Sequence, residues 1–320
     1  MGGTQRETNP FLYSDTNKRY HTYDYYLRHA FGEKCAKIPL DGGFTCPNRD
    51  GKCGTGGCIY CSERGSGEFA PSALLPIEEQ YEIGRERLRA KWGALKCIPY
   101  FQAYTNTYAP LSRLQELFDK AVALPDAVGL NVATRADCLS PEIVDYLASL
   151  SERTVVTVEL GLQSVHDETA ARINRGHTFA DFLAGYRLLR DRAPRVRICV
   201  HLILGLIGEN DEMMVESAQR VGELAPNEVK FHSLYVLKNT KMAEIYHNGG
   251  YIPLTRERYV DLVVKGICLM PADTVIGRLT GDGVENELIA PLWTQNKRCV
   301  LNEIDKKFYN ENLWQGKRLL

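Results

Sequence analysis

The chain has 320 residues, with 39 lysines and arginines against 40 acidic residues and a formal net charge of −1. Hydrophobic residues at 44% and charged residues at 25% are ordinary proportions for a globular protein, and the length suits one large core or two modest domains. The balanced charge excludes a global positive field that would capture nucleic acid, although a local basic patch is still allowed.

The sequence predicts neither a membrane span nor a secretory signal. The longest apolar run, Ile198 to Gly208, is too short to cross a bilayer, and the first 19 residues are polar. We expect residues 1–19 to be a flexible leader and the protein to be cytoplasmic, with no membrane partner. In that reducing compartment, ten cysteines indicate metal binding or burial rather than disulfides.

A strand-then-helix rhythm begins near Cys35 and predicts an α/β fold. Amphipathic helices are expected around Leu111–Phe118, after Ser140 as N-cap and Pro141 at the first helical position, and over Phe179–Arg190 and Asp211–Leu224. The strand-like runs are Ala36–Phe44, Ile98–Tyr104, Val128–Ala133, Thr154–Leu160, Val196–Leu204 and Val229–Val236. Six βα repeats without a GxGxxG turn predict a partial (β/α)6 barrel of the TIM type, with its functional residues at the carboxyl ends of the strands.

The alternation weakens after Lys238. The segment from Tyr259 through Trp293 indicates a helix followed by a short β region and a loop. We therefore predict a core barrel over residues 20–238 and a C-terminal extension over 239–320 that packs on the barrel.

The segment CPNRDGKCGTGGCIYC, from Cys46 to Cys61, contains four of the ten cysteines. Three kinds of metal site compete for it. Four cysteines can hold a structural zinc ion or a ferredoxin-like cluster, and three can hold a [4Fe–4S] cluster with one iron left open. The Cys-x-aromatic-Cys element at its end, directly after the first strand, favours the three-cysteine cluster.

These motifs carry a resemblance that covers nearly the whole chain. Together with KIPLDGGFTCPNRDG and GGCIYCS, the stretches YFQAYTNTYAP, ATRADCL, VELGLQS, INRGH, HLILGLIGE and RLTGDG resemble the radical S-adenosylmethionine (SAM) superfamily. Within it, the chain is similar to bacterial proteins related to the catalytic subunit of Elongator. The resemblance implies a barrel of the radical SAM type that uses a [4Fe–4S] cluster and SAM. It also implies Cys46, Cys58 and Cys61 as cluster ligands, while the alternative set Cys53, Cys58 and Cys61 stays open.

The resemblance also implies where SAM binds. The expected contacts lie at the ends of the second to fifth strands: Tyr104, Asn106, Arg135, Asp137, Glu159, Gln163, Ser164, Gly205 and Glu209. Thr105 lies between Tyr104 and Asn106 at the end of the second strand. At that strand end, backbone carbonyls are an alternative to the side chains as SAM contacts.

Several of these residues also have a structural interpretation. Glu159 could pair with a buried arginine such as Arg135. His201 is expected to be a hydrogen-bonded core residue, whereas His177 could meet the substrate. Arg278 and Asp282 could form a structural pair or line the mouth of the barrel.

The resemblance implies an enzyme that reductively cleaves SAM to a 5′-deoxyadenosyl radical, with a reductase, flavodoxin or ferredoxin as electron donor. The hypothesis that follows is modification of a tRNA wobble uridine. Seven arginines between Arg172 and Arg197 would suit phosphate contacts, although they could equally be a solvated face.

The chain leaves no room for Elongator's acetyltransferase domain, so acetyl-CoA-dependent carboxymethylation is not expected. The alternatives are a radical SAM enzyme acting on a small metabolite or a protein, and a non-catalytic zinc- or cluster-binding module.

Overall fold

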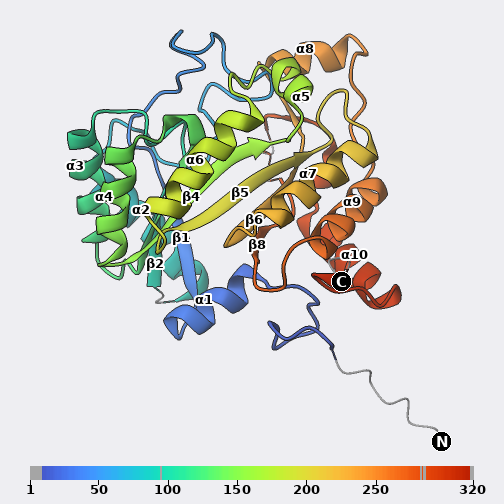
Figure 1. Ribbon diagram of the computed structural model, residues 1–320, viewed down its shortest axis with the longest axis horizontal. Helices are drawn as coiled ribbons and strands as arrows, with labels where there is room; N and C mark the ends of the chain where they lie inside the picture. The colour runs from blue at the N-terminus through green and yellow to red at the C-terminus, as the bar shows by residue number, and fades with distance from the viewer. Residues whose placement is uncertain (1–8, 94–95, 282, 284–285, 318–320) are drawn as a thin grey trace, which may run out of the picture.

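The computed structural model describes residues 9–93, 96–281, 283 and 286–317 (Figure 1). The strands are β1 (Cys35–Leu40), β2 (Lys96–Phe101), β3 (Gly129–Thr134), β4 (Val155–Gln163), β5 (Arg197–Leu204), β6 (Glu228–Ser233), β7 (Val236–Leu237), β8 (Val275–Arg278) and β9 (Leu288–Ala290). The helices are α1 (Tyr23–Phe31), α2 (Ile77–Trp92), α3 (Leu111–Val122), α4 (Pro141–Ser151), α5 (Asp167–Arg172), α6 (Phe179–Arg192), α7 (Asp211–Glu223), α8 (Lys241–His247), α9 (Arg256–Cys268) and α10 (Lys297–Asn310), with short 3-10 helices at Ala136–Cys138 and Leu292–Gln295.

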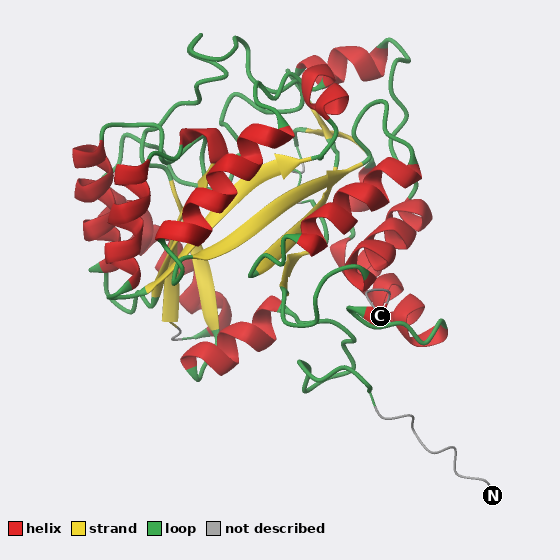
Figure 2. Cartoon of the chain, viewed as in Figure 1, coloured by secondary structure: helices red, strands yellow, loops and turns green. Residues whose placement is uncertain are grey.

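Seven strands form one parallel sheet in the order β1-β2-β3-β4-β5-β6-β8. The sheet curls, and helices such as α4, α6 and α7 lie across its outer face (Figures 1 and 2). Because every strand is parallel, all carboxyl ends meet at one end of this half-barrel. The loops that follow the strands, together with α5 and α8, gather at that end.

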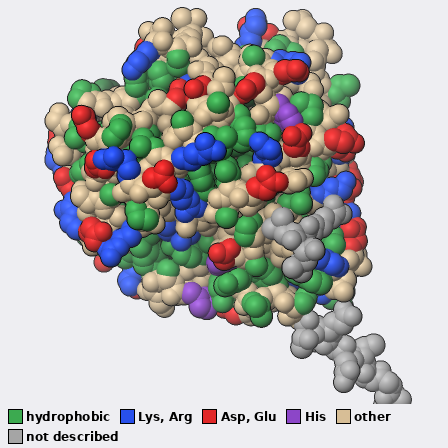
Figure 3. Space-filling model, viewed as in Figure 1, with side chains coloured by type: hydrophobic (Ala, Val, Ile, Leu, Met, Phe, Trp, Pro, Cys, Tyr) green, Lys and Arg blue, Asp and Glu red, His purple; other side chains and the backbone are tan. Residues whose placement is uncertain are grey.

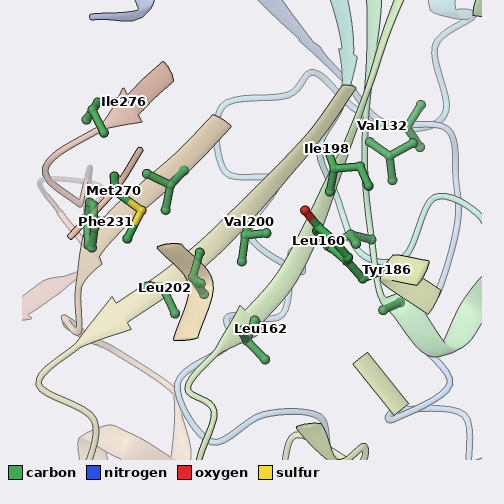
Figure 4. Close-up of a cluster of buried hydrophobic side chains, with 14 of the residues drawn as sticks. Val132, Leu160, Leu162, Tyr186, Ile198, Val200, Leu202, Phe231, Met270 and Ile276 are labelled. Carbon is green, nitrogen blue, oxygen red and sulfur yellow. The ribbon is translucent and has the colours of Figure 1, made fainter. Parts of the chain in front are cut away.

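The core lies between the sheet and the outer helices. On β4, Val156, Val158, Leu160 and Leu162 are fully buried, and on β5 the same holds for Ile198, Val200 and Leu202. These alternate positions point to one face, where they meet side chains such as Tyr186 of α6 (Figure 4). The intervening positions, among them Glu159 and His201, therefore face the inside of the half-barrel.

The six expected strands are all present, and the expected α/β half-barrel is confirmed. The first two strands end at Leu40 and Phe101, three or four residues earlier than the apolar runs suggested, because Phe44 and Tyr104 lie in loops. The N-cap prediction is also confirmed: the Ser140 side chain accepts a hydrogen bond from the Ile143 backbone at the start of α4.

The described segments near the two ends of the chain are in contact around Arg19 and Asn312. Within the expected leader, Phe11 and Arg19 are buried, and Arg19 donates to Asn312 near the C-terminus at 2.8 Å. In the expected C-terminal extension, β8 pairs with β6 and adds the seventh strand to the main sheet. Among the described residues, no helix has the length and apolar character needed to cross a bilayer.

Candidate active site

A cavity of about 240 Å³ opens at the carboxyl ends of the strands. Three cysteines of the expected cluster loop, Cys46, Cys58 and Cys61, line it. The rest of its wall comes from residues at or near the ends of β2 to β8, from the segment that follows Cys61, and from the loop after α5. The half-barrel thus brings the cysteine loop and the strand ends to one place, as the βα pattern predicted.

The cysteine loop is fixed by hydrogen bonds to other parts of the fold. The Ile59 backbone donates to Ile173 at 3.1 Å and accepts from Met242 at 2.8 Å, which ties the loop to the ends of α5 and α8. The Asn48 amide donates to the carbonyl of Asn174 at 2.5 Å. These contacts hold the thiols at the cavity independently of any bound metal.

The thiols are suited to a cationic metal group. Burial, and then the neighbouring Cys61, raises the pKa of Cys58 to about 12, and burial also raises the pKa of Cys61. A thiol ligates as the thiolate, so these two residues need a nearby positive charge to ionise. A metal cluster supplies that charge, and the donor set therefore fits one.

Cys53 does not share the cavity with the other three. It lines a separate surface hollow with Tyr108 and Cys138, is exposed, and accepts a contact from Arg135 at 3.5 Å. The structure therefore separates Cys53 from the set Cys46, Cys58 and Cys61.

Tyr104 clamps the segment that follows Cys61. Its hydroxyl donates to the carbonyl of Glu63, and its backbone donates to Gly65 at 2.9 Å. Arg49 donates to the carbonyls of Cys61 and Ser62, and its guanidinium lies 5.4 Å from the Tyr104 ring. Tyr104 has a φ of +61°, a costly conformation for an aromatic residue, so strain at this strand end accompanies the clamp.

We expect Gly65→Ala to disrupt this clamp. A Cβ at Gly65 would overlap the Tyr104 ring, and its φ of +59° adds a backbone cost. Gly56→Ala is the matched control, since Gly56 has a φ of +78° but open space around its Cβ position. Both variants lose about 1–2 kcal/mol from the backbone, but only G65A should also bind less iron after reconstitution. Equal iron content in the two variants would contradict a role for the clamp.

Four of the nine expected SAM contacts lie on the cavity wall, namely Tyr104, Arg135, Glu159 and Gln163. Thr105 lies there too. Gln163 also has a left-handed backbone, with φ +64°, at the irregular end of β4. Strain at both Tyr104 and Gln163 is typical of strand ends that serve a site.

The other five expected contacts do not line this cavity. Asn106 is buried and donates to the carbonyl of Ala133, and Asp137 pairs with Arg135. Ser164 donates to Glu209 at 2.5 Å, which joins the end of β4 to the turn after β5. Gly205 accepts from the Tyr251 hydroxyl. In this structure these five residues support the wall, and the full set of SAM contacts remains a prediction.

Glu159 is the centre of a buried polar network inside the half-barrel. Its carboxylate accepts from Lys37 at 2.8 Å, from Tyr100 at 2.8 Å and from His201 at 2.9 Å. Two further donors are Asn131, at 2.7 Å, and Lys230. Burial alone would raise the pKa of Glu159, but the ammonium groups of Lys230 and Lys37 outweigh burial and hold the pKa well below its usual range.

This network corrects the expected partner of Glu159 and adds to the expected role of His201. Glu159 is paired inside the barrel, but its partners are lysines and not Arg135, which binds Asp137 at 2.7 Å. His201 is hydrogen-bonded, as expected, and also lines the cavity. The lysine partners were missed, although their alternation with apolar residues along β1 and β6 is a readable signal of an inward polar face.

His177 lies on the cavity wall with both ring nitrogens buried and without a hydrogen-bond partner among the described residues. Burial, and then the charge of Arg175, lowers the pKa of His177 to about 3, so its ring is neutral. Arg278 also lines the cavity, while Asp282 lies outside the described residues.

The arginines of the arginine-rich segment do not gather into one patch. Arg175 is buried on the cavity wall, whereas Arg192 pairs with Asp145 at 2.5 Å and Arg195 pairs with Glu152 on the surface. The last turn of α6 and the start of β5 lie at the amino ends of the strands, away from the cavity. Basic and acidic side chains are interleaved over the face of the molecule that carries α6 and α7 (Figures 1 and 3). The solvated interpretation is the better one.

A parallel half-barrel with a three-thiol loop after its first strand defines an iron–sulfur enzyme of the radical SAM type. The chain belongs to the Radical SAM superfamily, whose model matches residues 50–221, and the Radical_SAM C-terminal domain model matches residues 226–310. Enzymes of this family use a [4Fe–4S] cluster and SAM and require an electron donor, so the chain is a radical SAM enzyme.

Individual relatives refine the comparison. The chain is 45% identical to Bacillus subtilis YtqA over 311 residues, 97% of this chain and 96% of that protein. It is 26% identical to the tRNA uridine(34) acetyltransferase of Methanocaldococcus jannaschii over 158 residues, 48% of this chain and 28% of that protein. The solved Elp3 structure from Methanocaldococcus infernus has a TM-score of 0.65 at 18% identity and covers 88% of this chain and 64% of that one, which shows a shared fold.

Proposed function

We propose that Cys46, Cys58 and Cys61 hold the cluster and that the adjoining cavity binds SAM. The observation that carries this proposal is the convergence of the three thiols and the ends of β2, β3 and β4 on one cavity. When bound, the cluster and SAM supply the reductive cleavage that yields the 5′-deoxyadenosyl radical. The chain's own contribution is to fix the cysteine loop, orient SAM with strand-end side chains and keep water out.

The substrate in this proposal is a wobble uridine of tRNA, and the protein acts in the cytoplasm with a flavodoxin, ferredoxin or reductase as electron donor. Support for the tRNA substrate comes from the likeness to an acetyltransferase named for tRNA uridine 34. The arginine-rich segment gives no support, because most of its charges are paired or face away from the cavity.

Deletion of the gene tests the substrate. We expect tRNA from the deletion strain to lack one modified uridine and to accumulate its precursor, as measured by chromatography and mass spectrometry of tRNA nucleosides. Complementation with the wild-type gene should restore the modification, and complementation with a Cys58→Ala variant should not. An unchanged nucleoside profile would reject tRNA as the substrate and favour a small metabolite or a protein.

A further inference from the structure

The part of the cavity wall built by β6 and β8 carries polar side chains that lie outside the cysteine loop and outside the nine expected SAM contacts. Lys230, His232 and Ser233 follow one another along the end of β6, and Arg278 ends β8. All four line the cavity. In the sheet order these strands are farthest from β1, which leads into the cysteine loop.

Two polar atoms on this wall have no partner. The Nε2 atom of His232 and the hydroxyl of Ser233 are buried and make no hydrogen bond among the described residues. An unsatisfied buried polar group costs about 1–3 kcal/mol, so these two atoms require a partner from a bound ligand or from water in the cavity. His201, whose ring centre lies 5.3 Å from that of His232, extends the same polar surface.

The electrostatics of this wall restrict the ligand. Burial lowers the pKa of both His201 and His232, so both rings are neutral. His201 donates its Nε2–H to Glu159, which leaves its Nδ1 as an acceptor, while His232 offers one donor and one acceptor. Lys230 is already paired with Glu159, and Glu228 lies on the adjacent inward position of β6. Lys37, Lys230 and Arg278 stand against the carboxylates of Glu159 and Glu228, so the charges on this side of the cavity nearly balance and favour neither an anionic nor a cationic ligand strongly. A neutral group with both carbonyl oxygens and an N–H fits best.

Resting on the proposed function, we infer that the wall formed by His201, His232 and Ser233 is the subsite for the hydrogen-bonding edge of the uracil base. That edge alternates acceptor, donor and acceptor, which two neutral imidazoles and a hydroxyl can match. Leu234 and Tyr235 line the cavity beside them and offer surface for the flat faces of the base. The uridine must leave its stack and enter the cavity to reach the radical, as bases do in other enzymes that act on them.

The test uses reconstituted full-length enzyme, SAM, a chemical reductant and bulk tRNA from the deletion strain, which contains the precursor. We expect His232→Phe to bind wild-type amounts of iron and SAM, and 5′-deoxyadenosine formation is measured for each variant with and without tRNA. The tRNA-dependent stimulation of H232F should fall about tenfold or more, the effect of losing one well-formed hydrogen bond to a buried group. His232→Gln, which retains hydrogen-bonding atoms, should keep part of the stimulation. His29→Phe, at an exposed position on α1, is the matched control.

The outcomes are distinguishable. If wild-type enzyme is not stimulated by this tRNA, the proposed function fails and the uracil subsite fails with it. If the wild type is stimulated and H232F is stimulated equally, only the subsite is overturned. Loss of iron or SAM binding in both H232F and H232Q would overturn it as well, because His232 would then serve the cofactors.

Discussion

Cys58→Ala is expected to abolish SAM cleavage. Cys58 is half-buried and lines the cavity, and among the described residues it shares that wall with two other loop cysteines, Cys46 and Cys61. Reconstituted wild-type protein should contain about four irons per chain with a visible absorbance that bleaches on reduction, whereas C58A should bind little iron. Formation of 5′-deoxyadenosine should fall below detection, because the remaining thiols cannot fix the cluster with one iron open to SAM.

The same substitution at Cys46, Cys53 and Cys61 separates the two candidate ligand sets. Cys46→Ala and Cys61→Ala should behave like C58A. Cys53→Ala should keep its iron and its activity, since Cys53 is exposed and lines a different hollow with Tyr108 and Cys138. An inactive, iron-poor C53A together with an active C46A would reverse the assignment. Zinc in place of iron in protein purified without oxygen would reject the cluster altogether.

The features of this fold that could be predicted from sequence are those that repeat locally. Apolar runs located all six expected strands, and Ser140 followed by Pro141 marked the start of α4. The seventh strand, β8, was missed as part of the sheet because it has four residues and lies more than forty residues after β6. Pairing over that separation depends on α9 packing against the core, which no local pattern encodes.

The polar network inside the half-barrel shows a further limit of prediction from sequence. Glu159 was identified as a buried acid, but its partners come from β1, β2, β3, β5 and β6. Sequence alternation shows that Lys37 and Lys230 face inward, yet it does not show which inward residues meet across the curled sheet. That depends on strand register and curvature, which only the assembled sheet supplies.

Glu159→Gln is expected to be the most destabilising single substitution inside the half-barrel. The variant keeps the side chain's shape but leaves Lys37 and Lys230 facing an uncharged amide in a buried site. Breaking a buried ion pair on one side costs about 3–5 kcal/mol, because a charge is left buried without its partner. Lys37 keeps a second carboxylate, Glu228 at 3.6 Å, so we expect most of the loss to come from Lys230. Thermal and chemical unfolding of wild type and E159Q measure this loss.

The matched control is Glu152→Gln at the surface, where Glu152 and its partner Arg195 have side chains 60% and 66% exposed. Screening by solvent limits that loss to about 1 kcal/mol or less. Adding Lys230→Met to E159Q should recover part of the stability, because it removes one uncompensated charge. If E159Q unfolds like E152Q, the lysines are not held by Glu159.

The network also sets a pH dependence. The pKa of Glu159 is held well below its usual range in the folded protein, so its ionised form stabilises the fold above the pKa of an unfolded glutamate, about 4.3. This contribution is lost as the pH falls below that value towards the folded pKa. The stability difference between wild type and E159Q should therefore be constant near neutral pH and shrink on acidification below about pH 4. A difference that stays constant into strong acid would show that Glu159 acts through packing and not through its charge.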